Sequence, residues 1–398
     1  MEDAARRRLN LGLATLAFAL CFSAWGLIAP LAKKFEDQLD LSSTRTAVLV
    51  AVPVVLGSLL RIPFGQLTDR YGGRRMFALM LLLSSVPAAL LGYAGSYASL
   101  VGVGFLLGVS GASFAVGVPF VSRWYPKERQ GFAVGIYGVG NIGTAVAAFS
   151  APAIVDHWGR PVLGWIYALV LVAGAAVFWL YATDPPPGRP VHYLEVVRAG
   201  WRLYRLALFY FLSFGGFVAM AIFLPKLLKD WFGYSLVEAG LRAAGFTVVA
   251  TLARPVGGWL SDRLGAYPVL VLAFAGVAVD AGVLGSIAHE PTIVPVTLAC
   301  LSLAAFLGLA NGAVFKLVPA EFPENTGAAT GIVGAAGGLG GFFPPLVMGV
   351  VKDQLGSYAL GFVGLLAFTA GCLVLAVWLL RRAPLAELRG LPHGSAHA

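Results

Sequence analysis

The stretch that decides the fold is RIPFGQLTDRYGGRR, residues 61–75, which joins the end of a long apolar run to a short basic loop. No charged residue lies between Val48 and Leu60, so Arg61 is expected on a helix that crosses a membrane. Asp69 follows eight residues later and is expected to open the loop. At 1.5 Å per residue, Arg61 would lie roughly 12 Å inside that boundary, near the middle of a hydrocarbon core about 30 Å thick. An ionisable residue at that depth is a candidate functional site.

The same phrase returns in the second part of the chain as RPVGGWLSDRLG, residues 254–265. Arg254 and Asp262 keep the spacing of Arg61 and Asp69, displaced by 193 residues. A second phrase, GFAVGIYG at 131–138, is echoed by GAATGIVG at 327–334 with a displacement of 196. This pattern indicates two parallel repeats, a class of fold that binds its substrate at the membrane midplane between the repeats.

The composition indicates a membrane protein that crosses the bilayer many times, since 59% of the 398 residues are hydrophobic and only 12% are charged. The net charge of +9 does not point to nucleic acid, because the basic residues are scattered through short loops. Cys21, Cys300 and Cys372 lie singly in apolar runs, so we expect neither a disulfide nor a metal site. No cofactor is expected, and no cluster of His, Cys, Asp or Glu suggests an enzyme.

We expect an all-α membrane protein with twelve transmembrane helices, arranged as two pseudo-symmetric halves of six. The expected spans are residues 11–32, 44–66, 76–95, 99–122, 131–154, 162–182, 205–226, 237–260, 267–287, 293–318, 328–351 and 357–380. The first half would cover residues 1–183, a cytoplasmic linker 184–204, the second half 205–383 and a tail 384–398. Most of the 28 Lys and Arg residues then lie on one side, which predicts cytoplasmic termini in the inner membrane. We expect a monomer.

Two buried arginines need a counter-ion. A pairing with intramembrane acids is one interpretation, but of the 19 Asp and Glu residues only Asp280 lies well inside an expected span. One carboxylate cannot neutralise Arg61, Arg254 and the third intramembrane cation, Lys316. A mobile anion is the better explanation, because the planar arginine fork suits two-point contact with an oxyanion and keeps its charge.

The loop GQLTDRYGGRR at 65–75, with its weaker copy GWLSDRLG at 258–265, resembles the loop between helices two and three of the major facilitator superfamily. With twelve spans and the six-plus-six repeat, this resemblance covers nearly the whole chain. Asp69 and Asp262 could accept hydrogen bonds from helix N-termini or pair with arginines at the inner surface. We expect them to act as gates that latch one conformation.

A narrower resemblance is to the nitrate/nitrite porter family of that superfamily. GIYGVGNIG at 135–143 looks like its nitrate signature, and GIVGAAGGLGG at 331–341 looks like the second copy. The resemblance implies a small planar anion held between Arg61 and Arg254, hydrogen-bonded by Tyr210 and Asn141, and sandwiched by Phe114 and Phe214. The signature glycines are Gly135, Gly138, Gly140, Gly143, Gly331, Gly334, Gly337, Gly338 and Gly340.

Plainer interpretations stay open for several of these residues. Glycines at three- and four-residue spacing commonly serve helix packing, and Asn141 could bond a neighbouring helix as readily as a ligand. Lys316 could snorkel toward the cytoplasm or pair with Glu321. Alternatively, its pKa could be depressed by the arginines, making it a proton carrier. The resemblance favours the second role, because FKLVP at 315–319 looks like the branch that moves nitrate with protons.

The sequence therefore predicts a secondary transporter for nitrate, and for nitrite as a second substrate, working by alternating access. Proton-coupled nitrate uptake is the first hypothesis, with protons as a coupling partner, and nitrate/nitrite antiport is the second. An organic-anion exchanger of the same superfamily is a more distant alternative. The expected partners are these anions and the lipid bilayer, without nucleic acid.

Overall fold

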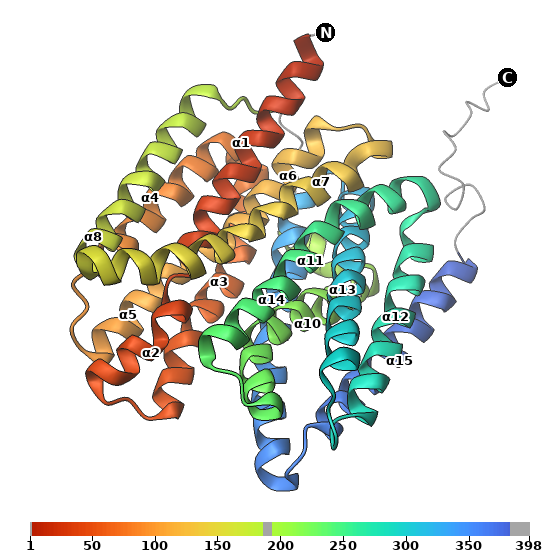
Figure 1. Ribbon diagram of the computed structural model, residues 1–398. Helices are drawn as coiled ribbons and strands as arrows, with labels where there is room; N and C mark the ends of the chain where they lie inside the picture. The colour runs from red at the N-terminus through yellow and green to blue at the C-terminus, as the bar shows by residue number, and fades with distance from the viewer. Residues whose placement is uncertain (1, 186–192, 383–398) are drawn as a thin grey trace, which may run out of the picture.

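A computed structural model shows that the chain is a bundle of long helices (Figure 1). The structure describes residues 2–185 and 193–382. The first half contains α1 (Glu2–Trp25), α2 (Ile28–Leu39), α3 (Ser43–Tyr71), α4 (Gly73–Leu91), α5 (Tyr97–Leu107), η1 (Gly108–Ala112), α6 (Ser113–Trp124), η2 (Lys127–Arg129), α7 (Gln130–Gly138), η3 (Val139–Ile142) and α8 (Gly143–Tyr181). Here η marks short 3₁₀ helices.

One short helix, α9 (Tyr193–Arg198), lies in the predicted linker. The six long helices that follow are α10 (Trp201–Phe232), α11 (Leu236–Leu264), α12 (Ala266–Ser286), α13 (Ile293–Glu321), α14 (Thr326–Leu355) and α15 (Ala359–Arg382). Helix α10 begins four residues before the expected span and overlaps the predicted linker. Residues 186–192 of that linker and the tail 384–398 lie outside the described residues. The boundaries of the two halves stay a prediction.

Each of the twelve expected spans corresponds to helix in the described chain. Nine stretches there are long and apolar enough to cross a membrane by hydropathy. One of them, Lys127–Tyr181, contains two spans, because helix α8 is broken at Gly159, whose φ of +83° is left-handed. Helices α11 and α14 complete the set.

The two repeats turn in the same way. Gly72 joins α3 to α4 and Gly265 joins α11 to α12, each as a single residue with φ +86°. Only glycine adopts this conformation without steric cost. We call the end of the bundle that carries these two turns the turn face, and the opposite end the far face. Asp69 lies in the last turn of α3, which continues to Tyr71, so the helix is longer than the sequence predicted.

The halves meet along two crosswise helix pairs, α3 against α14 and α11 against α7. Glycines make both approaches very close. A Cβ atom added at Gly65 would lie 2.0 Å from the carbonyl oxygen of Gly327, and one at Gly131 would lie 2.4 Å from that of Gly258. Backbones in contact can pack and slide without interlocking side chains. The interface therefore suits halves that move against each other.

Candidate functional site

Arg61 and Arg254 meet at the centre of the bundle, one from each half. Both are only 3% exposed. The Cζ atom of Arg61 lies 5.9 Å from the ring centroid of Phe114 and 5.2 Å from that of Phe214. For Arg254 the corresponding distances are 5.7 and 5.3 Å. The structure thus brings these four predicted site residues into one cluster, with both guanidinium groups against the same two rings.

Each arginine donates a hydrogen bond to a backbone carbonyl of the opposite half. Arg61 Nη1 lies 2.6 Å from the carbonyl oxygen of Gly334 on α14, and Arg254 Nη1 lies 3.4 Å from that of Gly138 on α7. A Cβ atom at Gly334 would lie 3.1 Å from Arg61 Cδ, and one at Gly138 would lie 3.2 Å from Arg254 Cδ. At these two signature glycines, the absence of a side chain lets each arginine reach the glycine's own carbonyl oxygen. The same absence allows close helix packing.

Each arginine also has a partner in its own half. Arg61 Nε donates to the carbonyl oxygen of Gly111 in η1 at 3.1 Å. Arg254 Nη2 donates to the hydroxyl oxygen of Tyr210 on α10 at 3.2 Å. All of these acceptors are neutral groups.

Acidic side chains do not neutralise the pair. Within residues 2–185 and 193–382, no Asp or Glu forms an ion pair with Arg61 or Arg254. Asp280, the one acid expected inside a span, lies on α12, which packs against α13 and α15. Buried charges are normally paired. The cluster therefore has an excess of positive charge that a small anion would balance.

Aromatic rings wall the cluster. Tyr210 stacks on Phe214 with centroids 4.9 Å apart at 4°, and on Phe114 at 6.1 Å and 8°. Phe315 on α13 meets Phe114 and Tyr210 edge-on, each at 4.7 Å. Phe315 was not among the site residues predicted from the sequence. Its position directly before Lys316, in the phrase that suggested the proton-coupled branch, was the available signal.

Asn141 is 1% exposed, and neither its amide nitrogen nor its amide oxygen has a hydrogen-bond partner in the described chain. It lies in the 3₁₀ helix η3, three residues after Gly138. Side chains three residues apart are eclipsed in a 3₁₀ helix, so Asn141 shares the face of Gly138 that meets Arg254. A hydrogen bond from Asn141 to a neighbouring helix, one of the two open interpretations, is not formed among the described residues.

The remaining signature glycines make close backbone contacts. An added Cβ would lie 2.9 Å from the Arg254 carbonyl oxygen at Gly135 and 2.5 Å from the Arg61 carbonyl oxygen at Gly331. The others contact the aromatic or serine side chains and backbones of nearby helices: Gly140 (Phe18), Gly143 (Ala19), Gly337 (Tyr210), Gly338 (Ser58) and Gly340 (Phe211). Their geometry supports the packing interpretation.

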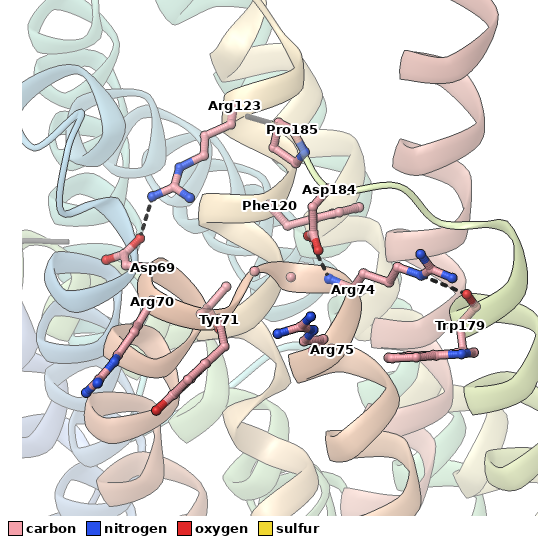
Figure 2. A pocket seen from close by; sticks show the side chains of 13 residues that line it. Asp69, Arg70, Tyr71, Arg74, Arg75, Phe120, Arg123, Trp179, Asp184 and Pro185 are labelled. Carbon is pink, nitrogen blue, oxygen red and sulfur yellow. Dashed lines mark hydrogen bonds and ion pairs between the residues drawn. The ribbon is translucent and has the colours of Figure 1, made fainter. Parts of the chain in front are cut away.

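Asp69 connects the two halves at the turn face. Its Oδ1 accepts hydrogen bonds from Arg123 Nη2 at 2.9 Å and from the backbone N–H of Gly327 at 3.1 Å. Its Oδ2 accepts from the N–H of Ala328 at 2.9 Å. Gly327 and Ala328 belong to the first turn of α14, where N–H groups lack helical partners and the helix dipole favours negative charge. Figure 2 shows Asp69 and Arg123 facing each other.

A cavity of about 410 Å³ lies beside this contact at the turn face. Its lining includes Asp69, Arg74, Arg75, Arg123 and Asp184. Asp184 accepts a hydrogen bond at 2.8 Å from the backbone N–H of Arg74, whose side chain donates to the Trp179 carbonyl (Figure 2). The cavity is lined by residues 68–75, at the junction of α3 and α4. It therefore lies beside the Asp69 contact and not at the arginine cluster.

Asp262 repeats the arrangement in the other direction. It accepts hydrogen bonds from the backbone N–H of Gly131 at 3.0 Å and of Phe132 at 2.8 Å, both in the first turn of α7. Lys316 Nζ lies 2.6 Å from Asp262 Oδ1 and also donates to the Lys127 carbonyl. Asp69 therefore binds the second half from the first, and Asp262 binds the first half from the second.

Lys316 accordingly lies in the Asp262 contact at the turn face. The alternative of pairing with Glu321 does not occur in the structure, where Glu321 Oε1 accepts from Arg205 Nη2 at 2.7 Å. Lys316 follows Arg123 by 193 residues, the displacement of the repeat. Sequence analysis missed Arg123, and applying that displacement to Lys316 would have found it.

The fold and the crosswise arginine site define a transporter of the major facilitator superfamily. The superfamily model matches residues 14–343 and 206–397, so the chain belongs to that superfamily. Two solved structures share the fold: the human organic anion transporter MFSD10 (TM-score 0.75, 16% identity, 94% of this chain and 99% of that one) and the proton:xylose symporter XylE (0.76, 15%, 96% and 97%).

Within the superfamily, the chain belongs to the family of the nitrate and nitrite transporters. It is 40% identical to the nitrite extrusion protein of Bacillus subtilis, covering 94% of this chain and 95% of that one. It is 42% identical to the probable nitrate/nitrite transporter NarK2 of Mycobacterium tuberculosis, with 95% and 98% coverage. The probable nitrate transporter NarT of Staphylococcus aureus is 38% identical, with 92% and 94% coverage. The chain is thus a multi-pass membrane transporter and not an enzyme.

Proposed function

We propose that this protein carries nitrate and nitrite across the cytoplasmic membrane by alternating access. The observation that carries the proposal is the buried pair Arg61 and Arg254, which contact the same two aromatic rings and form no ion pair with an acid in the described chain. The printed names of relatives near 40% identity support these anions as the substrates.

The anion would take hydrogen bonds that the arginines now give to carbonyls. A planar oxyanion accepts two parallel N–H bonds from one guanidinium fork, and such charge-assisted bonds are stronger than bonds to neutral acceptors. Tyr210 and Asn141 supply further polar contacts, while Phe114 and Phe214 cover the faces of the anion. A flat, narrow site of this kind favours planar ions.

Occupancy would be coupled to movement through charge. Two guanidinium groups that face each other repel, and an anion between them lowers that repulsion. A ligand shifts a conformational equilibrium only as far as it prefers one state. The anion binds best where both arginines reach it, so it favours the state with the halves close together.

Asp69 and Asp262 are proposed as gates at the turn face. With the excess of Lys and Arg placed inside, this face and both termini would be cytoplasmic. Opening the site to the cytoplasm would pull α14 away from Asp69 and α7 away from Asp262. Both carboxylates would then lose the helix N-termini that they now hold.

Proton-coupled uptake of nitrate is the first coupling scheme, with Lys316 as the proton carrier. Lys316 Nζ pairs with Asp262 Oδ1 at 2.6 Å while the gate is closed. Opening of the gate would pull α7 from Asp262 and the Lys127 carbonyl from Lys316, since both acceptor groups belong to the other half, and would expose the ammonium to the cytoplasmic side, where its proton would leave. Exchange of nitrate for nitrite is the second scheme, and its two anions are those that the relatives' printed names contain.

The test is nitrate uptake into proteoliposomes, with current recorded beside it, because exchange of nitrate for nitrite moves no net charge. Under proton symport, nitrate uptake should grow with an inward pH gradient and should be accompanied by a current when more than one proton enters with each nitrate. Under exchange, nitrate uptake should require nitrite inside and should ignore the pH gradient. Failure of nitrate to move under both conditions would refute the proposal, and competition by bulky carboxylates would favour an organic-anion exchanger.

A further inference from the structure

The cavity of about 410 Å³ beside Asp69 has a positively charged lining, separate from the Arg61–Arg254 cluster (Figure 2). Its volume lies in the range of small-molecule sites, about 300–1,000 Å³. Four arginines and two aspartates line it, which leaves an excess of two positive charges: Arg70, Arg74, Arg75 and Arg123, with Asp69 and Asp184. The cavity therefore has both the size and the charge to hold an anionic ligand.

Both aspartates of the lining are already engaged by helix N-termini. Asp69 accepts hydrogen bonds from two backbone N–H groups of α14. Asp184 accepts one from the backbone N–H of Arg74, in the first turn of α4. In the described ranges 2–185 and 193–382, no acid forms an ion pair with Arg70, Arg74 or Arg75. The described protein thus leaves these three charges unbalanced.

The second repeat does not carry the same arginines. Arg74 and Arg75 correspond to Tyr267 and Pro268, which lie 193 positions later. The glycine turn that precedes each pair nevertheless has the same φ of +86°. The turn therefore forms without arginines after it, so their presence in the first repeat has another cause.

Aromatic side chains place the cavity at the level of the lipid headgroups. Tyr71 and Trp179 line it and are 45% and 47% exposed. Exposed tyrosine and tryptophan near helix ends are typical of the membrane–water interface. Arg70 Cζ lies 5.2 Å from the Tyr71 ring centroid, and Arg74 Cζ lies 4.9 Å from that of Trp179. Both guanidinium groups are thus held at the depth where lipid phosphates lie.

An exposed apolar stripe on α4 leads from the cavity into the membrane. Arg75 is exposed at its start, and the same helix face carries Leu79, Leu82, Leu83 and Val86, which are between 42% and 57% exposed. A phospholipid would cover both surfaces, with its phosphate at Arg75 and its acyl chains along the stripe. A free phosphate ion would cover only the first.

We propose that this cavity binds the phosphate group of an anionic phospholipid from the leaflet at the turn face. A guanidinium fork donates two parallel hydrogen bonds to phosphate oxygens, which makes arginine well suited to this headgroup. On the proposed orientation the leaflet is the cytoplasmic one, where basic pockets between transmembrane helices bind anionic headgroups. The lipid site does not depend on which anion the protein transports.

The test compares lipid binding by two double variants. Arg70→Gln with Arg75→Gln removes two exposed arginines of the cavity. The matched control, Arg263→Gln with Arg382→Gln, removes two exposed arginines outside it, each of which stacks on a tryptophan. Native mass spectrometry of the full chain in detergent measures the bound fraction of phosphatidylglycerol, and of phosphatidylcholine with the same acyl chains. A further arm adds inorganic phosphate as a competitor.

The unaltered chain and the control should bind phosphatidylglycerol more tightly than phosphatidylcholine. The cavity variant should bind phosphatidylglycerol roughly 25-fold more weakly, about fivefold for each arginine removed. Its melting temperature without lipid should not change, because both side chains are exposed; if it falls, Arg75→Gln alone should still bind about fivefold more weakly.

Two results would overturn the lipid site: equal affinity of the two double variants for phosphatidylglycerol, or no preference of the unaltered chain for this lipid over phosphatidylcholine. Displacement of phosphatidylglycerol by inorganic phosphate at equal concentration would overturn it in favour of a site for free phosphate. Each of these results is independent of whether the protein carries nitrate.

Discussion

Arg123 and Lys316 occupy equivalent positions in the two repeats, 193 residues apart. Each forms an ion pair with the aspartate near the end of a long helix of its own half, Arg123 with Asp69 at 2.9 Å and Lys316 with Asp262 at 2.6 Å. Each aspartate also binds the first turn of a helix from the opposite half. The turn face is therefore closed by two related contacts that differ in one respect. One has a guanidinium, which keeps its proton, and the other has an ammonium, which can release it.

This difference makes Lys316→Arg a sharp test of the proton-carrier hypothesis. Arginine should preserve the ion pair with Asp262 but cannot release a proton, so transport driven by a pH gradient should be lost while nitrate/nitrite exchange remains. Lys316→Ala should also lose proton dependence. The measurement is nitrate uptake in liposomes with and without a pH gradient. An unchanged response to the gradient in Lys316→Arg would exclude Lys316 as the carrier and leave it only the gate contact.

Replacement of either central arginine by lysine should abolish transport. An ammonium group cannot reproduce the planar fork, and loss of one charge-assisted hydrogen bond costs about 1.5–3 kcal/mol. Nitrate binding should therefore weaken roughly 10- to 100-fold. Isothermal titration calorimetry with nitrate measures this for Arg61→Lys and Arg254→Lys. Arg263→Lys is the control, since Arg263 is exposed and stacks on Trp259 at the end of the same helix; near-normal binding by both test variants would remove these arginines from the site.

Phe114→Ala should weaken the preference for planar over tetrahedral anions. The Phe114 ring lies within 6 Å of both guanidinium groups and stacks on Tyr210, so its removal opens space at the face of a bound ion. Competition of the tetrahedral anions perchlorate, sulfate and phosphate with nitrate uptake gives the preference. Phe149→Ala, at a 59% exposed position on α8, serves as the control. An unaltered order of competitors would contradict the aromatic cover.

Gly331→Ala should impair transport through the backbone. Its Cβ would lie 2.5 Å from the Arg61 carbonyl oxygen, a contact that only a shift of α3 from α14 can relieve. We expect the variant to keep its helices but to lose nitrate uptake, since the halves can no longer close. Circular dichroism and flux are measured together. Gly371→Ala on α15 is the matched control, because a Cβ there meets nothing within 4 Å; equal uptake by the two variants would argue against a required close approach.

Much of this architecture was predictable from local pattern. Hydrophobic length set the spans, and the 193-residue repeat around Arg61 and Arg254 placed two cations at one depth. The prediction that Asp69 opens a loop was wrong, because α3 continues for two more residues, to Tyr71, and Gly72 forms the turn. Polar residues near a membrane surface occur both in helices and in loops, so their polarity does not show where the helix ends. The Gly72 turn sets that end.

Hydrogen bonds from helix N-termini to Asp69 and Asp262 were expected and are present, whereas the partners of Lys316 were not predictable. Lys316 was expected to snorkel toward the cytoplasm, to pair with Glu321 or to lie near the arginines, whereas it reaches Asp262 and the backbone of Lys127. The partners of Lys316 depend on how α7 and α11 cross. The spacing of residues along a single helix does not show how two helices cross. For the same reason the only signal for Phe315 was its position beside Lys316, since it becomes part of the site through its contact with Tyr210 on α10.

The hydrogen bonds of the arginine pair divide into two kinds. Arg61 has Gly111 on its own half and Gly334 on the other, and Arg254 has Tyr210 on its own half and Gly138 on the other. Under the proposed alternating access, separation of the halves would leave each guanidinium its hydrogen bond within its own half and would break only the bond to the other half. Separation of the halves would therefore cost each guanidinium one hydrogen bond, which the transported anion would replace. Neither charge would be left in the membrane interior without a hydrogen-bond partner.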